Sequence, residues 1–146
     1  MINALKAKLA ANDLTNINPL CLLLEDPNDP ALQGKKYDLI LSHLVLHHVP
    51  SLEALLTTMY GCLKPGGRIA LTDFERFSPE SRKFHPESKM EGVERHGICK
   101  MEMECVIKDA GFNRPQARFA FAMEKSVEPE GSMTFPFLIC LGEKRS

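Results

Sequence analysis

The sequence predicts a single α/β domain over residues 1–146, built on a largely parallel β-sheet. A strand, a helix, a turn and a second strand follow one another within residues 37–74, which is the order of a βαβ unit with parallel strands. The run at residues 20–24 is apolar throughout, as is typical of a strand buried on both faces of a parallel sheet. Two apolar segments near the C-terminus, separated by a turn sequence, indicate an antiparallel hairpin.

Composition and charge exclude several classes of protein. The chain has 18 basic and 19 acidic residues and a formal net charge of -1, so it carries no broad electrostatic footprint for nucleic acid or an anionic membrane. No apolar run approaches the roughly 18 residues of a membrane span. The five cysteines form no Cys-x-x-Cys pair, and their odd number argues against a disulfide framework. We therefore expect a cytoplasmic protein with neither nucleic-acid nor membrane partners.

The N-terminal part is expected to contain a helix, a strand and a loop. Apolar residues recur at helical spacing over residues 2–12, which predicts a short helix. The apolar run within residues 18–25 predicts the strand. Residues 26–30 contain two prolines and three turn-forming residues, which cannot continue either element, so they predict a loop.

The next segment predicts the βαβ unit itself. Residues 37–43 form the first strand, and Ser51 can accept a backbone hydrogen bond as the N-cap of the helix. A Lys-Pro-Gly-Gly turn at residues 64–67 ends the helix, with Gly66 placed for a positive φ. Residues 68–74 form the second strand. The side chains expected to be mutually buried in this unit are Leu39, Leu41, Leu55, Met59, Ile69 and Leu71.

In the rest of the chain, one segment has a weak secondary-structure pattern and several segments have clear ones. Residues 75–98 are polar and show little periodicity, whereas apolar positions over residues 103–110 predict a helix. Gly111 is placed for the left-handed residue after that helix, and Phe112 for the contact with Ile107 that accompanies a Schellman cap. The final hairpin is expected to comprise strands at residues 118–123 and 135–141 and a turn at residues 128–131.

Several short motifs occur in a familiar order: YDLI at residues 37–40, LHHV at 46–49, LKPGGR at 63–68, and a longer stretch over 96–112. In this order the chain resembles the C-terminal part of a class I S-adenosylmethionine (SAM)-dependent methyltransferase. The resemblance is to the small-molecule, type 11 group that includes ubiquinone and menaquinone biosynthesis enzymes. It implies a partial Rossmann-like, doubly wound sheet with the family's strands 3, 4, 5, 6 and 7, and with strands 1 and 2 absent. It also implies SAM as cofactor and a small-molecule methyl acceptor.

The same resemblance implies positions for cofactor contact. In such sheets ligands bind beyond the carboxyl ends of strands where the strand order reverses, so Ser42 and His43 are expected beside SAM. Asp26 or Glu25 is expected as the acid on the adenine side, with a register that places Leu22 there as the alternative. No Gly-x-Gly-x-Gly sequence occurs in the chain, so we expect the N-terminal cofactor motif to be missing from it.

Histidines are the candidates for a general base, which oxygen acceptors can require. His96 is the first candidate because its segment resembles the acceptor side of the family, and His85 is the second. The alternative for both is a solvated loop histidine. His47 and His48 are expected to fix the geometry of the turn in which they lie.

The histidines also invite a metal interpretation, since His43 and His47 lie four residues apart. A ligand pair at that spacing needs a continuous helix, whereas His43 ends a predicted strand, and no third ligand is evident. The sequence therefore predicts no metal site.

Two functions follow from these observations. The first is SAM-dependent methyl transfer to a small-molecule acceptor. The alternative is a catalytically inactive methyltransferase remnant that acts as an interaction module or is an incomplete gene product. Both share one fold, so the fold does not discriminate between them.

The predicted sheet has an open edge. The family neighbour of the strand at residues 37–43 is absent, and an unpaired strand edge is a template for other chains. Either residues 20–24 pair with this strand inside one chain, or two chains form a homodimer along it. We favour the pairing within one chain, because its loop-closure cost is lower.

Overall fold

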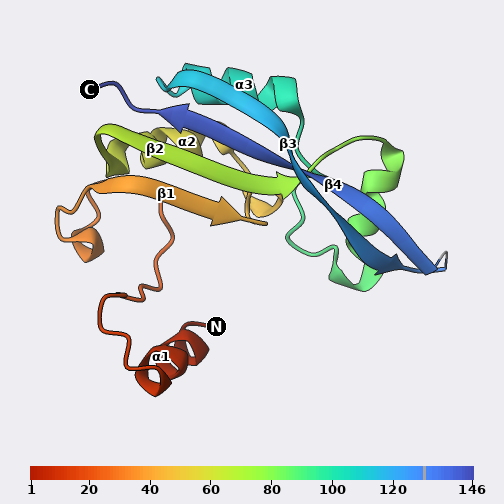
Figure 1. Cartoon of the computed structure of the whole chain (residues 1–146), viewed down its shortest axis with the longest axis horizontal. Coiled ribbons are helices and arrows are strands. Elements are labelled where there is room, and N and C mark those ends of the chain that lie inside the picture. Colours follow the sequence, from red (N-terminus) through yellow and green to blue (C-terminus); the bar gives the residue numbers. More distant parts are fainter. Residues whose placement is uncertain (130) are drawn as a thin grey trace.

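The computed structural model describes residues 1–129 and 131–146, and its strands form one mixed four-stranded sheet in the order β1-β2-β4-β3 (Figure 1). β1 pairs with β2 in parallel, and β4 pairs with β2 and β3 in antiparallel fashion. The α/β class and the antiparallel C-terminal hairpin are thus confirmed. Glu130, in the expected turn, lies outside the described residues. The main elements are α1 (Ile2–Ala11), β1 (Tyr37–His43), α2 (Leu52–Cys62), β2 (Leu63–Phe74), α3 (Lys100–Asp109), β3 (Asn113–Val127) and β4 (Gly131–Glu143).

The βαβ unit forms as the sequence predicts. Ser51 is the N-cap of α2, and its hydroxyl oxygen accepts a hydrogen bond of 3.1 Å from the backbone N–H of Ala54. Gly66 has a φ of +76°, which is the conformation that the turn requires and that glycine adopts without steric cost. Regular pairing of β2 with β1 resumes at Arg68, beyond this turn.

The C-terminal end of α3 is closed by the Schellman motif expected from Gly111 and Phe112. Gly111 has a φ of +98° and donates its backbone N–H to the Lys108 carbonyl at 2.9 Å. Phe112 donates to the Ile107 carbonyl at 3.2 Å and is buried in the same cluster as Ile107. This cap turns the chain from α3 into β3.

The strand expected within residues 18–25 does not form, and this prediction is wrong. Residues 17–26 lie outside helix and strand, and β1 pairs only with β2. The pairing within one chain that we favoured is therefore also wrong. An apolar run becomes a strand only where a ladder partner is available. Here a side chain contacts the end of the segment instead, since the Thr58 hydroxyl of α2 donates to the Glu25 carbonyl at 3.1 Å.

One hydrophobic core lies on the face of the sheet beneath α2 and α3, which both lie on that side (Figure 1). Ile69, Leu71 and Met59 are buried there, as expected. A second buried cluster consists of Phe74, Phe84, Val127, Phe135 and Phe137. Leu39 and Leu41 are 51% and 70% exposed, so their predicted burial is wrong. Side chains of a strand alternate between faces, and Ile40 packs against the core under the helices, so Leu39 and Leu41 lie on the opposite face. α1 lies apart from the sheet (Figure 1).

Candidate functional site

The carboxyl ends of β1 and β2 meet at one edge of the sheet, where His43 is paired in register with Thr72. Beyond β1 the backbone reverses through Leu44, whose φ is +56°, and enters a short 3-10 helix at Leu46–His48. This turn brings His47 next to Asp73, the penultimate residue of β2. Polar side chains from two consecutive strands thus converge at the edge where open α/β sheets bind ligands.

His47 and Asp73 form a buried pair with 1% and 0% exposure. Nδ1 of His47 lies 2.8 Å from each carboxylate oxygen of Asp73. The backbone N–H of His47 donates to the same carboxylate at 3.0 Å, and that of Phe74 donates at 2.9 Å. A carboxylate only accepts hydrogen bonds, so in the neutral imidazole Nδ1 carries the hydrogen and Nε2 carries the lone pair.

Nε2 of His47 is buried and has no hydrogen-bond partner within the described part of the chain. A histidine whose Nδ1–H is oriented by a carboxylate and whose Nε2 is unoccupied has the geometry of a general base. The carboxylate fixes the tautomer and the ring orientation, and it stabilises the imidazolium that forms when Nε2 takes a proton. Because Nε2 is buried, the pair can remove a proton only from a group that gains access to this nitrogen.

Arg95 holds the histidine turn in place. Its guanidinium donates to the backbone carbonyls of Leu46, Val49 and Pro50, and the Val49 bond measures 2.7 Å. Its backbone N–H donates to the His47 carbonyl at 3.2 Å. The segment at residues 75–98, whose sequence pattern was weakest, thus covers the turn through contacts that no periodicity would indicate.

Two further histidines lie beside His47. His48 is exposed, and its Nδ1 lies 2.7 Å from the carbonyl oxygen of Gly92. His85 follows a 3-10 helix at Pro79–Phe84, and its ring centroid is 4.9 Å from that of His47. Burial lowers the pKa of His85 from 6.5 to about 4, with repulsion from His47 and Lys125 as further causes, so its imidazole is neutral near pH 7.

Ser42 and His43 lie at the carboxyl end of β1, where the resemblance placed them. Nδ1 of His43 lies 2.7 Å from the Thr72 hydroxyl oxygen, and its ring stacks on Phe137 with centroids 5.9 Å apart. The Ser42 hydroxyl is buried without a hydrogen-bond partner among the described residues. Their contact with a cofactor stays a prediction.

Asp26 lies elsewhere. Its carboxylate accepts a bond of 2.8 Å from the backbone N–H of Asn28, and the adjacent Pro27 packs against Gly61 in the last turn of α2. That turn leads into the start of β2, the end of the unit opposite His43. The structure does not bring Asp26 to Ser42 and His43, and its role as the adenine-side acid stays a prediction.

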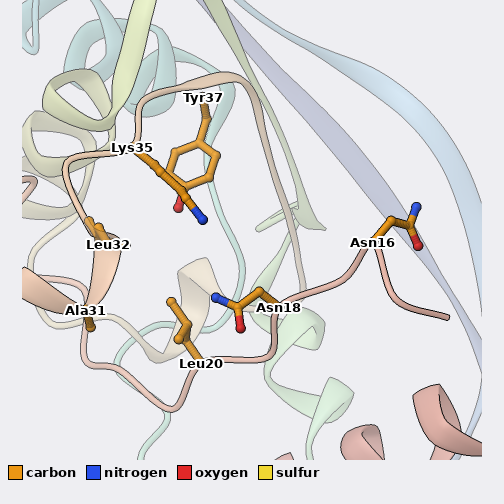
Figure 2. A pocket seen from close by; sticks show the side chains of 7 residues that line it. All are labelled: Asn16, Asn18, Leu20, Ala31, Leu32, Lys35 and Tyr37. Carbon is orange, nitrogen blue, oxygen red and sulfur yellow. The ribbon is translucent and has the colours of Figure 1, made fainter.

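A hollow at this opposite end of the unit lies between the N-terminal segment and the start of β1 (Figure 2). Tyr37, the first residue of β1, points into it together with Lys35 (Figure 2). The hollow is separated from the histidine turn by the length of β1. It is lined by Asn16, Asn18, Leu20, Ala31, Leu32, Lys35 and Tyr37.

His96, the first candidate for a general base, is half-buried between Arg95 and Gly97. Its Nδ1 has no hydrogen-bond partner in the described part of the chain. His85, the second candidate, lies in a cluster with His47 and His48, and His96 is not part of this cluster. Catalysis by His96 stays a prediction, whereas the geometry of a base belongs to His47.

Sequence reasoning missed the pairing of His47 with Asp73, which are 26 positions apart. The two residues were interpreted separately, one as part of a turn and the other as the end of a strand. The available signal was the occurrence of polar residues just after or at the carboxyl ends of two consecutive parallel strands, because such ends lie side by side.

Comparisons with known proteins agree on one fold. A family model described as a methyltransferase domain matches residues 1–69. A highly reducing polyketide synthase of Strobilurus tenacellus is 43% identical over 51 residues, which are 35% of this chain and 2% of that protein. An O-methyltransferase family protein from Burkholderia thailandensis superposes with a TM-score of 0.63 at 20% identity, over 99% of this chain and 41% of its own. The trans-methyltransferase CalH, solved with SAH, superposes with a TM-score of 0.61 at 19% identity, over 94% and 38%.

The chain thus has the fold of a class I SAM-dependent methyltransferase, in part. It spans less than half the length of the two solved structures to which it is compared. No helix in residues 1–129 and 131–146 is long and apolar enough to cross a membrane.

Proposed function

We propose that this chain forms the acceptor side of a SAM-dependent methyltransferase site for a small molecule. The observation that carries the proposal is the buried His47–Asp73 pair, with Nε2 of His47 unoccupied at the carboxyl edge of β1 and β2. The fold supports methyl transfer as the reaction class, and the position of the pair supports a role in the chemistry.

The residues present fit SAM in part. SAM, when bound, supplies an electrophilic methyl group. Ser42 offers a hydroxyl without a hydrogen-bond partner among the described residues, and His43 offers an exposed ring, both at the edge where a ligand is expected. The chain contains no Gly-x-Gly-x-Gly loop that would let the backbone approach the cofactor closely.

His47 acts on the acceptor in this proposal. With SAM bound, the acceptor would gain the methyl group as the sulfur–methyl bond breaks and S-adenosylhomocysteine leaves. Nε2 of His47 would take the proton of the acceptor, and Asp73 would stabilise the resulting imidazolium. Positioned proton transfer of this kind contributes about 10²–10⁴-fold to a rate. The substrates that need such a base are acceptors whose attacking atom still carries a proton near neutral pH, such as the oxygen of a hydroxyl group.

A second candidate function, an inactive remnant that works as an interaction module, is favoured by a different observation. The apolar side chains of Leu39 and Leu41 are exposed on a strand that pairs on one side only. Such a surface fits a covering partner. The two functions are distinguished by whether the chain transfers a methyl group.

We expect the isolated 146-residue chain to bind SAM no tighter than roughly millimolar, because it lacks the glycine loop that supplies many polar contacts. Isothermal titration calorimetry measures this affinity directly. A micromolar dissociation constant would contradict the expectation and would show that Ser42, His43 and their neighbours suffice.

The base is tested by methyl transfer from labelled SAM, supplied at several times its measured dissociation constant, to a panel of phenols and catechols. We expect His47→Gln to lower the rate about 10²–10⁴-fold, and the matched variant His96→Gln to retain it. Loss of transfer in His96→Gln alone would restore the base that the sequence predicted. No transfer by the parent chain at saturating SAM would favour the interaction module.

A further inference from the structure

His47, His48 and His85 form a three-histidine cluster, although they come from two segments of the chain that are far apart in sequence. Each offers one ring nitrogen, and these nitrogens all lie within 4.8 Å of one another. The ring centroids are 4.0 Å apart for His47 and His48, and 5.7 Å apart for His48 and His85. The 3-10 turn after β1 supplies two members, and the residue that ends the helix Pro79–Phe84 supplies the third.

The hydrogen bonds around the cluster leave lone pairs available. Nδ1 of His47 faces the Asp73 carboxylate and Nδ1 of His48 faces the Gly92 carbonyl, and both of these partners only accept. In the neutral rings both Nδ1 atoms therefore carry hydrogen, and both Nε2 atoms present a lone pair. Ligating histidines in metal sites have this arrangement, with the outer nitrogen donating to a carboxylate or a backbone carbonyl.

Two ring nitrogens of the cluster lack the hydrogen-bond partner that a buried polar atom normally has. Nε2 of His47 and Nδ1 of His85 are both buried without a hydrogen-bond partner in the described chain. Most buried polar side-chain atoms in native proteins have a partner, so two that lack one in the same cluster call for a ligand.

We propose that His47, His48 and His85 bind a divalent transition metal of the zinc type, with three imidazole ligands and a fourth position open to water or another ligand. Imidazole nitrogen suits zinc, cobalt, nickel and copper and does not suit magnesium or calcium. A tetrahedral zinc site at about 2.0–2.1 Å per Zn–N bond requires nitrogens about 3.4 Å apart. The ring nitrogens, which lie within 4.8 Å of one another, would have to draw closer to bind the metal.

The charges that face the cluster are Asp73, behind His47, and Lys125, whose charge acts on His85. Lys125 also donates to the Phe84 carbonyl and lies over the Phe84 ring at 4.1 Å from its centroid. The negative charge of the Asp73 carboxylate favours binding of a metal cation, whereas the positive charge of the Lys125 ammonium disfavours it.

Metal binding and proton abstraction exclude each other at His47, because both use the same lone pair on Nε2. The metal site does not depend on the proposed function, and its test needs no methyl acceptor. If the chain is also a methyltransferase, zinc bound to the cluster inhibits it.

Cobalt provides the direct probe. Tag-free chain is titrated with Co²⁺, since four-coordinate Co²⁺ develops strong visible absorption bands, and Zn²⁺ is then added to displace it. We expect one Co²⁺ per chain, displacement by Zn²⁺ and not by Mg²⁺, and no intense sulfur-to-cobalt absorption in the near ultraviolet, since no cysteine belongs to the cluster.

Variants assign the ligands. His48→Ala, at an exposed position, and His85→Ala should each weaken Zn²⁺ binding by more than about 10-fold, with folding checked by circular dichroism. His43→Ala and His96→Ala are the matched controls and should bind as the parent does. Absence of Co²⁺ bands and of Zn²⁺ binding at about 100 μM would overturn the proposal, as would affinity that neither His48→Ala nor His85→Ala changes.

Discussion

Asp73 is a carboxylate with no exposed surface, and such burial is stable only where hydrogen bonds replace the lost hydration. The backbone N–H groups of His47 and Phe74 and the ring of His47 supply these bonds. Because the same contacts orient the imidazole, the interactions that stabilise the buried charge also direct Nε2 of His47. The two residues depend on each other for stability and for reactivity.

Cys140 lies fully buried in β4, and burial raises its pKa from 9.0 to about 12, with the charges of Asp73 and Glu104 as further causes. The folded chain then holds this proton more tightly than the unfolded chain does. The resulting stability is fully present below pH 9 and is lost progressively as the pH rises from 9 toward 12.

Urea unfolding as a function of pH tests this expectation. The free energy of unfolding of the parent should fall more steeply above pH 9 than that of Cys140→Ala, which lacks the titrating thiol. Cys105→Ala, at an exposed thiol, is the control and should keep the slope of the parent. Identical slopes for the parent and Cys140→Ala would contradict the expectation.

At the scale of the element, β2 is the central strand of the helix-covered unit, whereas β1 is its edge. Leu71 in β2 is fully buried, so Leu71→Ala leaves a cavity and should cost about 2–5 kcal/mol. Leu41 in β1 is 70% exposed, and Leu41→Ala should change stability by about 0.5 kcal/mol or less. Chemical unfolding of both variants measures the difference, and a loss below about 0.5 kcal/mol for Leu71→Ala would show that the strand is not central.

The elements that the sequence predicted correctly depend on contacts between near neighbours. The N-cap at Ser51, the turn at Gly66 and the Schellman cap at Gly111 each close within a few residues, so their residue types are diagnostic. The run at residues 20–24 needed a ladder partner from elsewhere, and no local pattern shows whether one exists.

The same distinction between local contacts and contacts of distant residues applies to the candidate site. The positions of Ser42 and His43 at the end of a strand follow from strand periodicity and order along the chain. The pairing of His47 with Asp73 and the arrival of His85 depend on the path of residues 75–98, which has no periodic signal. That path is set by scattered contacts such as those of Arg95 with three backbone carbonyls.

At the scale of the whole molecule, the two helices α2 and α3 cover one face of the sheet, and Phe84 packs against Phe74, Phe135 and Phe137 in a separate buried cluster. The face opposite the helices presents Leu39, Leu41 and part of Phe121 to solvent. Among the described residues β1 pairs only with β2, so one row of its backbone N–H and C=O groups has no ladder partner there. An exposed edge next to an apolar face favours addition of another strand.

We propose that a second copy of the chain pairs along β1, giving a homodimer through the open sheet edge. An edge strand related to itself by a two-fold axis is self-complementary. Asp38, which forms an ion pair with Lys64 at 2.8 Å, is the one Asp, Glu, Lys or Arg within β1. Light scattering should therefore show a mass that rises with concentration, together with modest thermal stability. Leu41→Lys places a charge on the edge at an exposed position and should shift the chain toward monomer.

The matched control for this last variant is Met101→Lys, because Met101 is 76% exposed on α3, away from β1. It adds the same charge and removes a similar apolar area, so it separates an effect at the edge from a general gain in solubility. We expect association to persist in Met101→Lys and to weaken in Leu41→Lys. If both variants lower the apparent mass equally, the contact is nonspecific, and a parent chain that stays monomeric at all concentrations with high thermal stability would refute pairing along β1.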